Sequence, residues 1–215
     1  MAKTVLRNGA GGEITHIYYT TFNGTNIYLT ILDFNRMLEF SSKDVDEYYS
    51  GEAEEEVDSL KEDIEISAFF AATLAWGQRK TIINNTNKIM QWMGEEPYLF
   101  IVQHSANDLK IFEKFVHRTF NATDVLYFIE VLKRWYEKGQ SLEDYFVGNT
   151  MKDRIAHFHL AFFDNDFVSE RTKKHIANPA KNSSAKRLNM YLRWMVRDND
   201  IDFGLWKSIH TSKLK

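Results

Sequence analysis

The residues best suited to bind an anion lie between positions 178 and 197. Residues 178–182, Asn-Pro-Ala-Lys-Asn, predict a break in the chain, and a helix is expected from about Ala185 to Arg197, with Ser183 and Ser184 as candidate N-cap residues. At about 100° per residue, three cations of this helix fall within a strip about 40° wide: Lys186, Arg193 and Arg197. Free amides at a helix N-terminus, followed by a row of cations, can bind the phosphates of nucleic acid.

The same spacing has a structural explanation. Arg187 and Trp194 flank the basic strip, and the apolar residues gather on the other side of the helix: Leu188, Tyr191, Leu192 and Met195. Many surface helices are amphipathic and have a solvated polar face, so spacing alone favours this simpler interpretation. Phosphate binding is therefore a hypothesis that needs further support.

Other chemistry is poorly represented in the sequence. The chain has no cysteine, which excludes disulfides, thiolate metal sites and cysteine nucleophiles. Residues 198–202 resemble the start of a calcium loop, but Phe203 stands where that loop needs glycine and Ile209 where it needs glutamate. His157 and His159 are two residues apart, which on a helix points them in different directions. We expect no metal and no cofactor.

The net charge of −3 results from two opposed regions. Residues 39–65 contain twelve acids and two bases, a balance of −10, whereas residues 171–215 contain eleven bases and three acids, a balance of +8. Because the total conceals a strongly basic region, net charge does not argue against a nucleic-acid partner.

The elements that would position the basic segment are predicted to be helices. Only 10 glycines and 2 prolines interrupt the 215 residues, about half the usual share. A helix that is apolar on most sides, and hence central, is expected from Asp63. Others are expected at about 80–93, 107–117, 123–138, 141–147 and 151–163. Gly139 is expected to close the fourth of these helices, and residues 117–120 to end the helix at 107–117.

The N-terminus differs from this helical pattern. Two β-branched and aromatic runs flank Asn23-Gly24 within residues 13–33, which predicts a β-hairpin. Residues 41–59 are polar and acidic, which is typical of a mobile linker or a frayed helix. We therefore expect residues 1–60 to hold the hairpin and the acidic segment, and residues 61–215 to form a mainly α, multi-helix bundle.

Several blocks of sequence resemble a known family. Residues 184–197, Ser-Ala-Lys-Arg-Leu-Asn-Met-Tyr-Leu-Arg-Trp-Met-Val-Arg, are followed by Asp-Phe-Gly-Leu-Trp at 202–206, and this resembles the signature of an uncharacterised bacterial domain-of-unknown-function family. Residues 63–77 and 117–120 are similar to earlier blocks of that family, so the resemblance covers about residues 60–215. The family is in turn distantly similar to the helix-hairpin-helix base-excision DNA glycosylases.

That similarity implies a fold and a chemistry. It implies a bundle of the helix-hairpin-helix glycosylase type, with residues 182–186 in place of the glycine-rich hairpin and Lys186 as the catalytic nucleophile that attacks the deoxyribose carbon. It further implies DNA as partner, and Trp76, Trp194 and Trp206 as walls of a base pocket. The implied phosphate-binding residues are Lys181, Ser183, Ser184, Arg187, Arg193, Arg197 and Arg118.

Two departures from the glycosylases bear on catalysis. Asn182, Ser183 and Ser184 are not glycines, and glycines bring the hairpin amides close to a phosphate. In the resembling family an aspartate-containing segment follows the position of Leu214, so we expect the domain at 61–215 to be incomplete at its C-terminus.

The alternatives are a non-catalytic nucleic-acid binder that uses the same basic face, and a protein-interaction module in which the acidic segment masks the basic helix. No run of 18 apolar residues and no signal-peptide core is present, so we expect a cytoplasmic protein without a membrane partner.

Overall fold

The structure of the protein is a computed structural model. It describes residues 61–164, 168–199 and 201–214 in full, together with the backbone of four N-terminal strands and of residues 54–60. The chain divides into two compact units, residues 1–61 and residues 62–215. Within the described residues no helix has both the length and the apolar character needed to cross a membrane.

The N-terminal unit contains two small antiparallel sheets. Strand β1 (Leu6–Arg7) pairs with β2 (Glu13–Ile14), and β3 (Tyr18–Phe22) pairs with β4 (Thr25–Leu29). The second pair runs from Tyr18 opposite Leu29 to Phe22 opposite Thr25, which confirms the hairpin predicted around Asn23-Gly24. Most of the predicted acidic segment, residues 41–53, lies outside the described residues.

The second unit is mainly helical, as expected. Helix α1 (Glu54–Leu74) begins before residue 62 and continues into this unit. The α-helices that follow are α2 (Arg79–Trp92), α3 (Pro97–Gln103), α4 (Ala122–Tyr136), α5 (Met151–Phe162), α6 (Glu170–Lys173) and α7 (Lys186–Val196). The 3-10 helices are η3 (Asp108–Lys114), η4 (Glu143–Tyr145), η5 (Pro179–Lys181) and η6 (Thr211–Leu214), and a two-stranded ribbon is formed by β5 (Val116–His117) and β6 (Phe120–Asn121).

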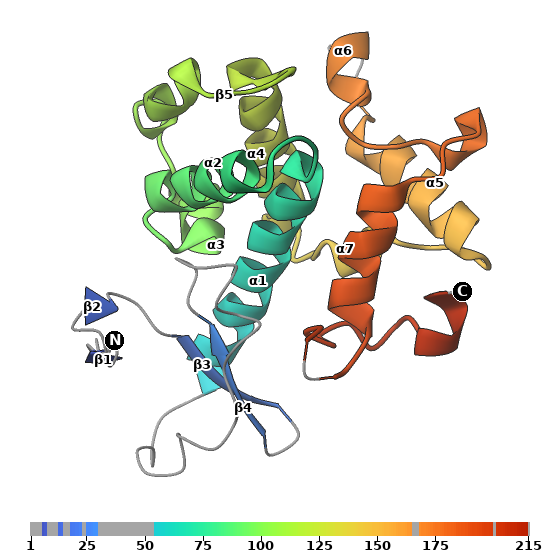
Figure 1. The fold of residues 1–215 in the computed structure, drawn as a ribbon, viewed down its shortest axis with the longest axis horizontal. Helices are drawn as coiled ribbons and strands as arrows, with labels where there is room; N and C mark the ends of the chain where they lie inside the picture. The colour runs from blue at the N-terminus through green and yellow to red at the C-terminus, as the bar shows by residue number, and fades with distance from the viewer. Residues whose placement is uncertain are drawn as a thin grey trace. The chain divides into compact units, whose positions relative to one another are not determined.

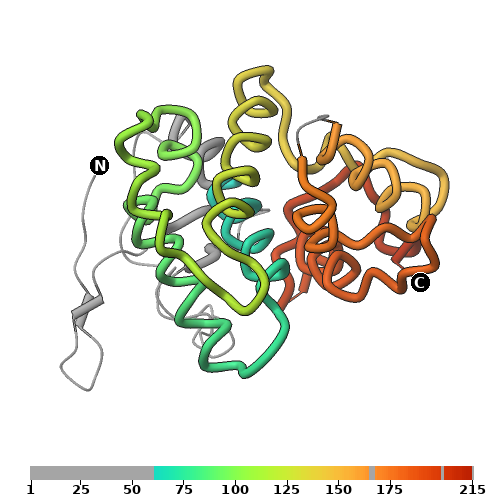
Figure 2. The backbone as a smooth tube through the Cα atoms, turned by 90° about the horizontal axis from the view of Figure 1, so that it is seen from above, coloured from blue at the N-terminus to red at the C-terminus, as the bar shows by residue number. Residues whose placement is uncertain are grey.

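Helix α1 lies at the centre of this unit (Figures 1 and 2), with α2 and α3 on one side and α5 to α7 on the other. The ring of Phe69 in α1 lies 5.6–5.7 Å from four rings of α4, α5 and α7: Phe128, Phe158, Phe162 and Tyr191. Aromatic pairs at such distances contribute about 0.5–1.5 kcal/mol each beyond the burial of their area. This cluster therefore fixes α7 against the rest of the unit.

Helix α7 runs antiparallel to α1. The Tyr191 hydroxyl donates to the backbone carbonyl of Glu65 at 3.2 Å, while Arg187, one turn earlier in α7, donates to the carbonyl of Thr73 near the end of α1. The predicted apolar face of α7 is buried, with Leu188, Tyr191, Leu192 and Met195 all at most 5% exposed. The N-terminus of α7 thus lies beside the C-terminus of α1.

Three local predictions need correction. The helix expected at 107–117 is the 3-10 helix η3, and residues 117–120 form the β5–β6 turn rather than a helix end, with Arg118 at φ 58°. The helix expected at 141–147 is a single 3-10 turn. Helices α3 and α6 were not expected from the sequence. In contrast, Gly139 closes α4 in the left-handed conformation, at φ 68°, as predicted.

Candidate functional site

The turn before α7, residues 182–185, contains two residues in backbone conformations that glycine adopts most easily. Asn182 and Ala185 have φ values of 61° and 46°, and non-glycine residues occupy this region at a steric cost. The Ser183 hydroxyl accepts from the N–H of Ala185 at 3.2 Å and stabilises the turn. The sequence lacks the glycines of a glycine-rich hairpin, yet two of its residues take left-handed backbone conformations. Strain of this kind is often retained at functional sites.

The turn forms one wall of an open cleft of about 420 Å³. Residues 182–185 and Asn189 line it together with Met151, Lys152, Ile155 and Pro179. Ser183, Ser184, Lys152 and Lys181 are exposed. An anion that entered the cleft would therefore meet hydroxyl groups with ammonium groups nearby.

Lys186 is the first residue of α7 and is exposed. The N-cap residue is Ala185, which has no side chain that could accept a hydrogen bond, so the prediction of Ser183 or Ser184 as the N-cap was wrong. The first intrahelical bond runs from Asn189 N–H to Ala185 O at 2.9 Å. Within the described part of the chain Lys186 makes no ion pair, which leaves its ammonium group available to a ligand.

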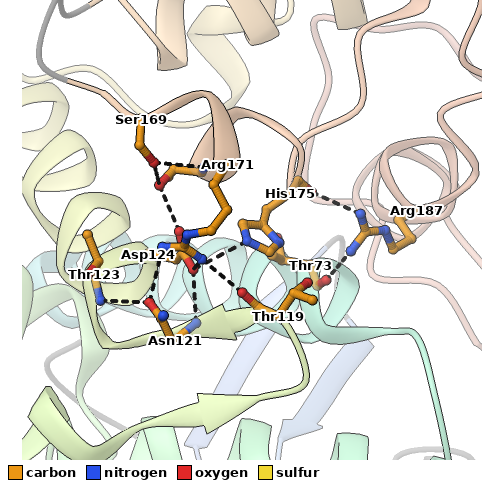
Figure 3. A network of polar contacts seen from close by, with 10 residues as sticks. Thr73, Thr119, Asn121, Thr123, Asp124, Ser169, Arg171, His175 and Arg187 are labelled. Atoms are coloured by element: carbon orange, nitrogen blue, oxygen red, sulfur yellow. Dashed lines mark hydrogen bonds and ion pairs between the residues drawn. The ribbon is translucent and has the colours of Figure 1, made fainter.

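Arg187 is placed differently from the phosphate-binding role predicted for it. One terminal nitrogen of its guanidinium donates to the carbonyl of Thr73 and the other to the carbonyl of His175 at 3.0 Å (Figure 3). Burial lowers the pKa of Arg187, although the group stays charged. Carbonyls at a helix C-terminus lack intrahelical partners and attract cations. Arg187 therefore caps α1 and ties it to the segment after α6.

His117 contacts the chain just beyond the same helix end. Its Nε2 lies 3.2 Å from the Trp76 carbonyl and its Nδ1 lies 2.9 Å from the side-chain amide nitrogen of Asn85. Burial is the main cause that lowers the pKa of His117, and the charges of Arg118 and Arg187 act in the same direction. A neutral ring that donates from Nε2 and accepts at Nδ1 satisfies both contacts.

Arg118 and Trp76, two predicted site residues, are brought together here. The guanidinium of Arg118 lies 4.8 Å from the centre of the Trp76 ring, in a cation–π contact. Arg118 is exposed and Trp76 is half-buried. The guanidinium thus covers one face of the ring that was predicted to hold a base, and a base could stack there only if Arg118 moved.

The other two tryptophans lie elsewhere. Trp206 is 1% exposed and donates from Nε1 to the Glu65 carboxylate at 2.5 Å, so its ring belongs to the core and its burial argues against base stacking. Trp194 is half-buried, and its carbonyl accepts from the N–H groups of Phe203 and Gly204. Glu65, the partner of Trp206, lies nine residues before the end of α1 at Leu74, about 14 Å along the helix, and Trp76 lies beyond that end. The three tryptophans therefore do not form one pocket.

Arg193 and Arg197 lie toward the C-terminal end of α7 and share one partner. The Nε atoms of the two arginines lie 3.2 and 3.5 Å from Oδ2 of Asp202, whose side chain is fully buried. The arginine side chains are 49% and 45% exposed. Sequence reasoning missed Asp202, although it falls within residues 198–202, the segment that resembles the start of a calcium loop.

A second missed feature is a polar network around Asp124 (Figure 3). Oδ2 of this buried carboxylate accepts from Arg171 at 2.6 Å and from the N–H of Asn121 at 2.9 Å, and Oδ1 accepts from Thr172 at 2.8 Å. Nε2 of His175 lies 3.3 Å from Oδ2, an ion-pair distance without hydrogen-bond geometry. The network joins the start of α4 to α6.

The charge of Asp124 is stabilised within this network. Burial is the largest single influence and opposes ionisation, but the contacts from His175, Arg171, Asn121 and Thr172 together outweigh it and hold the pKa of Asp124 well below its ordinary value. A signal for part of this existed in the sequence, because Asn121-Ala-Thr-Asp124 fits a capping box. Arg171 and His175 lie 47 and 51 residues further along the chain and carry no such signal.

Comparison with known proteins places the chain in a family. The family described as "Protein of unknown function (DUF2400)" matches residues 52–215. The chain belongs to this family. No curated protein and no solved structure matches the chain. The family match includes α1 to α7 and all the site residues above, while the similarity to glycosylases remains a prediction. Among the described residues no group of three or more His, Asp or Glu could hold a metal ion.

Proposed function

We propose that this protein binds DNA through backbone phosphates, using the turn at 178–186 and the exposed cations of α7. The observation that carries the proposal is the start of α7, where Lys186 is exposed and the helix has no side-chain N-cap. Unpaired N–H groups and the positive end of the helix dipole favour an anion at such a site.

Charges along the rest of the surface of α7 support the same proposal. Lys181 and Lys186 lie at one end of the helix, and Arg193 and Arg197 lie toward the other, all four of them exposed. Over its 11 residues, about 16 Å, α7 therefore presents cations at both ends. This length covers several phosphates of one DNA strand.

The test is the salt dependence of duplex binding, measured by fluorescence anisotropy with the full chain. Each phosphate contact contributes about 0.9 to the slope of log affinity against log salt concentration. We expect Lys186→Glu to weaken binding at least tenfold and to lower the slope. Lys110→Glu is the matched control: it makes the same change of charge on η3, where Lys110 donates to the exposed Asn107 at 3.0 Å. Equal effects of the two variants would refute this site.

We further propose, following the resemblance to glycosylases, that Lys186 reacts with abasic DNA. The uncharged amine would add to the sugar aldehyde at C1′ and lose water to form a Schiff base. Loss of a C2′ proton to solvent would then form the C2′–C3′ double bond and break the C3′–O bond, so that the phosphate leaves as the 5′-phosphate end of the downstream strand. The exposure of Lys186 supports access to a sugar. Asp202, the buried aspartate that follows α7, lies at the far end of the helix and so is not placed to assist this amine.

Borohydride trapping on an abasic duplex tests this step separately. Borohydride reduces the Schiff base to a stable adduct, which we expect for the natural chain and not for Lys186→Arg, a variant that retains the charge and therefore the DNA affinity. If the natural chain binds DNA but yields no adduct, the protein is a non-catalytic binder. If it fails to bind DNA at low salt and changes its size when salt is added, the interaction-module alternative is favoured instead.

A further inference from the structure

The arginine pair on α7 is oriented by a carboxylate that sequence reasoning did not identify. Asp202 is 5% exposed, and the same oxygen, Oδ2, lies 3.2 Å from Nε of Arg193 and 3.5 Å from Nε of Arg197. Nε is the inner nitrogen of the guanidinium. A contact through Nε uses the side edge of the guanidinium, which is not the end edge between its two terminal nitrogens.

The outer edges of both arginines are open to a ligand. Within the described residues the side-chain contacts of Arg193 and Arg197 run from Nε to Asp202, and each side chain remains close to half exposed. The two Nε atoms are less than 7 Å apart because both lie within 3.5 Å of one oxygen. Two guanidinium forks this close can bind a single phosphate group or two adjacent ones.

The loop that carries Asp202 is itself held in place. Oδ1 of Asn199 accepts from the N–H groups of Ile201 and Asp202, both at 2.9 Å, and its amide nitrogen donates to Oδ2 of Asp202 at 3.2 Å. The N–H of Phe203 donates to the Trp194 carbonyl at 2.8 Å, which anchors the loop on the last turn of α7. The carboxylate therefore occupies a defined position relative to both arginines.

We propose that Asp202 is a positioning residue that presents Arg193 and Arg197 as a two-arginine clamp for DNA backbone phosphates. The inference rests on the proposed function, since it assumes that α7 faces DNA. Holding the two guanidinium groups in advance reduces the side-chain entropy lost on binding, which is large for a free arginine.

The proposal makes a prediction opposite in sign to simple electrostatics. Asp202→Asn removes a negative charge next to the binding surface, so Coulomb interaction alone predicts tighter binding of DNA. A positioning role predicts weaker binding, by about three- to tenfold, because the arginines lose their shared ionic partner. Asp198→Asn is the matched control: Asp198 is exposed, pairs with Lys207 at 3.4 Å and lies four residues before Asp202, and its loss should tighten binding slightly.

The experiment measures duplex affinity for the natural chain, Asp202→Asn, Asp198→Asn and the double variant Arg193→Lys/Arg197→Lys at several salt concentrations. The double variant retains both positive charges but removes the planar guanidinium forks, so the clamp predicts at least fivefold weaker binding. Affinity at or above that of the natural chain for both Asp202→Asn and the double variant would overturn the clamp. Absence of binding by the natural chain would instead overturn the proposed function.

Discussion

Substitution of Arg187 distinguishes most clearly between a residue that stabilises the fold and one that binds a ligand. The sequence places it next to Lys186 on a basic helix, whereas the structure uses both of its terminal nitrogens inside the protein, on the carbonyls of Thr73 and His175. We predict that Arg187→Ala destabilises the protein without removing a DNA contact.

The expected magnitude follows from the two bonds. A hydrogen bond from a charged donor contributes about 1.5–3 kcal/mol, and the lower value applies to a half-buried guanidinium. Loss of both bonds should therefore lower the free energy of unfolding by about 3 kcal/mol. Arg187→Lys can reach only one of the carbonyls and should cost about half as much. Arg193→Ala leaves the buried carboxylate of Asp202 with Arg197 and Asn199 as partners, so it should cost no more than about 1 kcal/mol.

The assay combines urea unfolding with the salt dependence of DNA binding for these variants. We expect Arg187→Ala to shift the unfolding midpoint at an unchanged m value and to retain the natural salt slope, because no phosphate contact is lost. Arg193→Ala should do the reverse, with near-normal stability and a slope lower by about 0.9. If Arg187→Ala is as stable as the natural chain and has the lower slope, Arg187 contacts phosphate and the structural role is refuted.

Three further predictions concern stability. Burial raises the pKa of Asp63 from its ordinary value of 3.8 to about 7, so the folded protein retains a proton that the unfolded chain loses. The free energy of unfolding should therefore fall by up to about 4 kcal/mol as pH rises from 4 to 7. Urea unfolding of Asp63→Asn should lack this fall, and a variant that retains it contradicts the prediction. Asp124 has a lowered pKa, so its contribution to the free energy of unfolding is present above about pH 4 and is lost as pH falls below that value. In urea unfolding, Asp124→Asn should lower the free energy of unfolding by about 3 kcal/mol at pH 7 and by progressively less in acid. A loss that does not change with pH would contradict the ionised network. Gly204→Ala should lower the melting temperature more than Gly139→Ala. Both glycines have φ above +60°, but of the two only Gly204 would place a new Cβ 2.7 Å from a backbone atom, the Cα of Asp198. Equal decreases in melting temperature would contradict this packing.

Residues with periodic or local signals were placed correctly from the sequence. The buried face of α7 follows from the spacing of Leu188 and Tyr191, the hairpin from Asn23-Gly24, and the end of α4 from Gly139. Each of these three features depends on the types of a few residues that are close together in the sequence, so the sequence alone is enough to predict it.

Features that depend on distant partners were not predicted. Nothing near Arg187 in the sequence indicates that its partner is Thr73, 114 residues away. Arg118 was expected at the end of the helix at 107–117, whereas it occupies a left-handed turn over Trp76. The sequence thus shows that a residue is basic, but tertiary structure decides whether its cation contacts a carbonyl, an aromatic ring or a ligand.

The central claim is that the exposed cations of α7 bind DNA phosphates, and the salt slope of duplex binding tests it most directly. We predict that the natural chain binds a duplex of about 20 base pairs, and that Lys181→Ala/Lys186→Ala/Arg193→Ala lowers the slope by about 2.7, or 0.9 for each lost contact. A triple variant that binds with the affinity and slope of the natural chain would contradict the claim, as would a natural chain that fails to bind DNA at 50 mM salt.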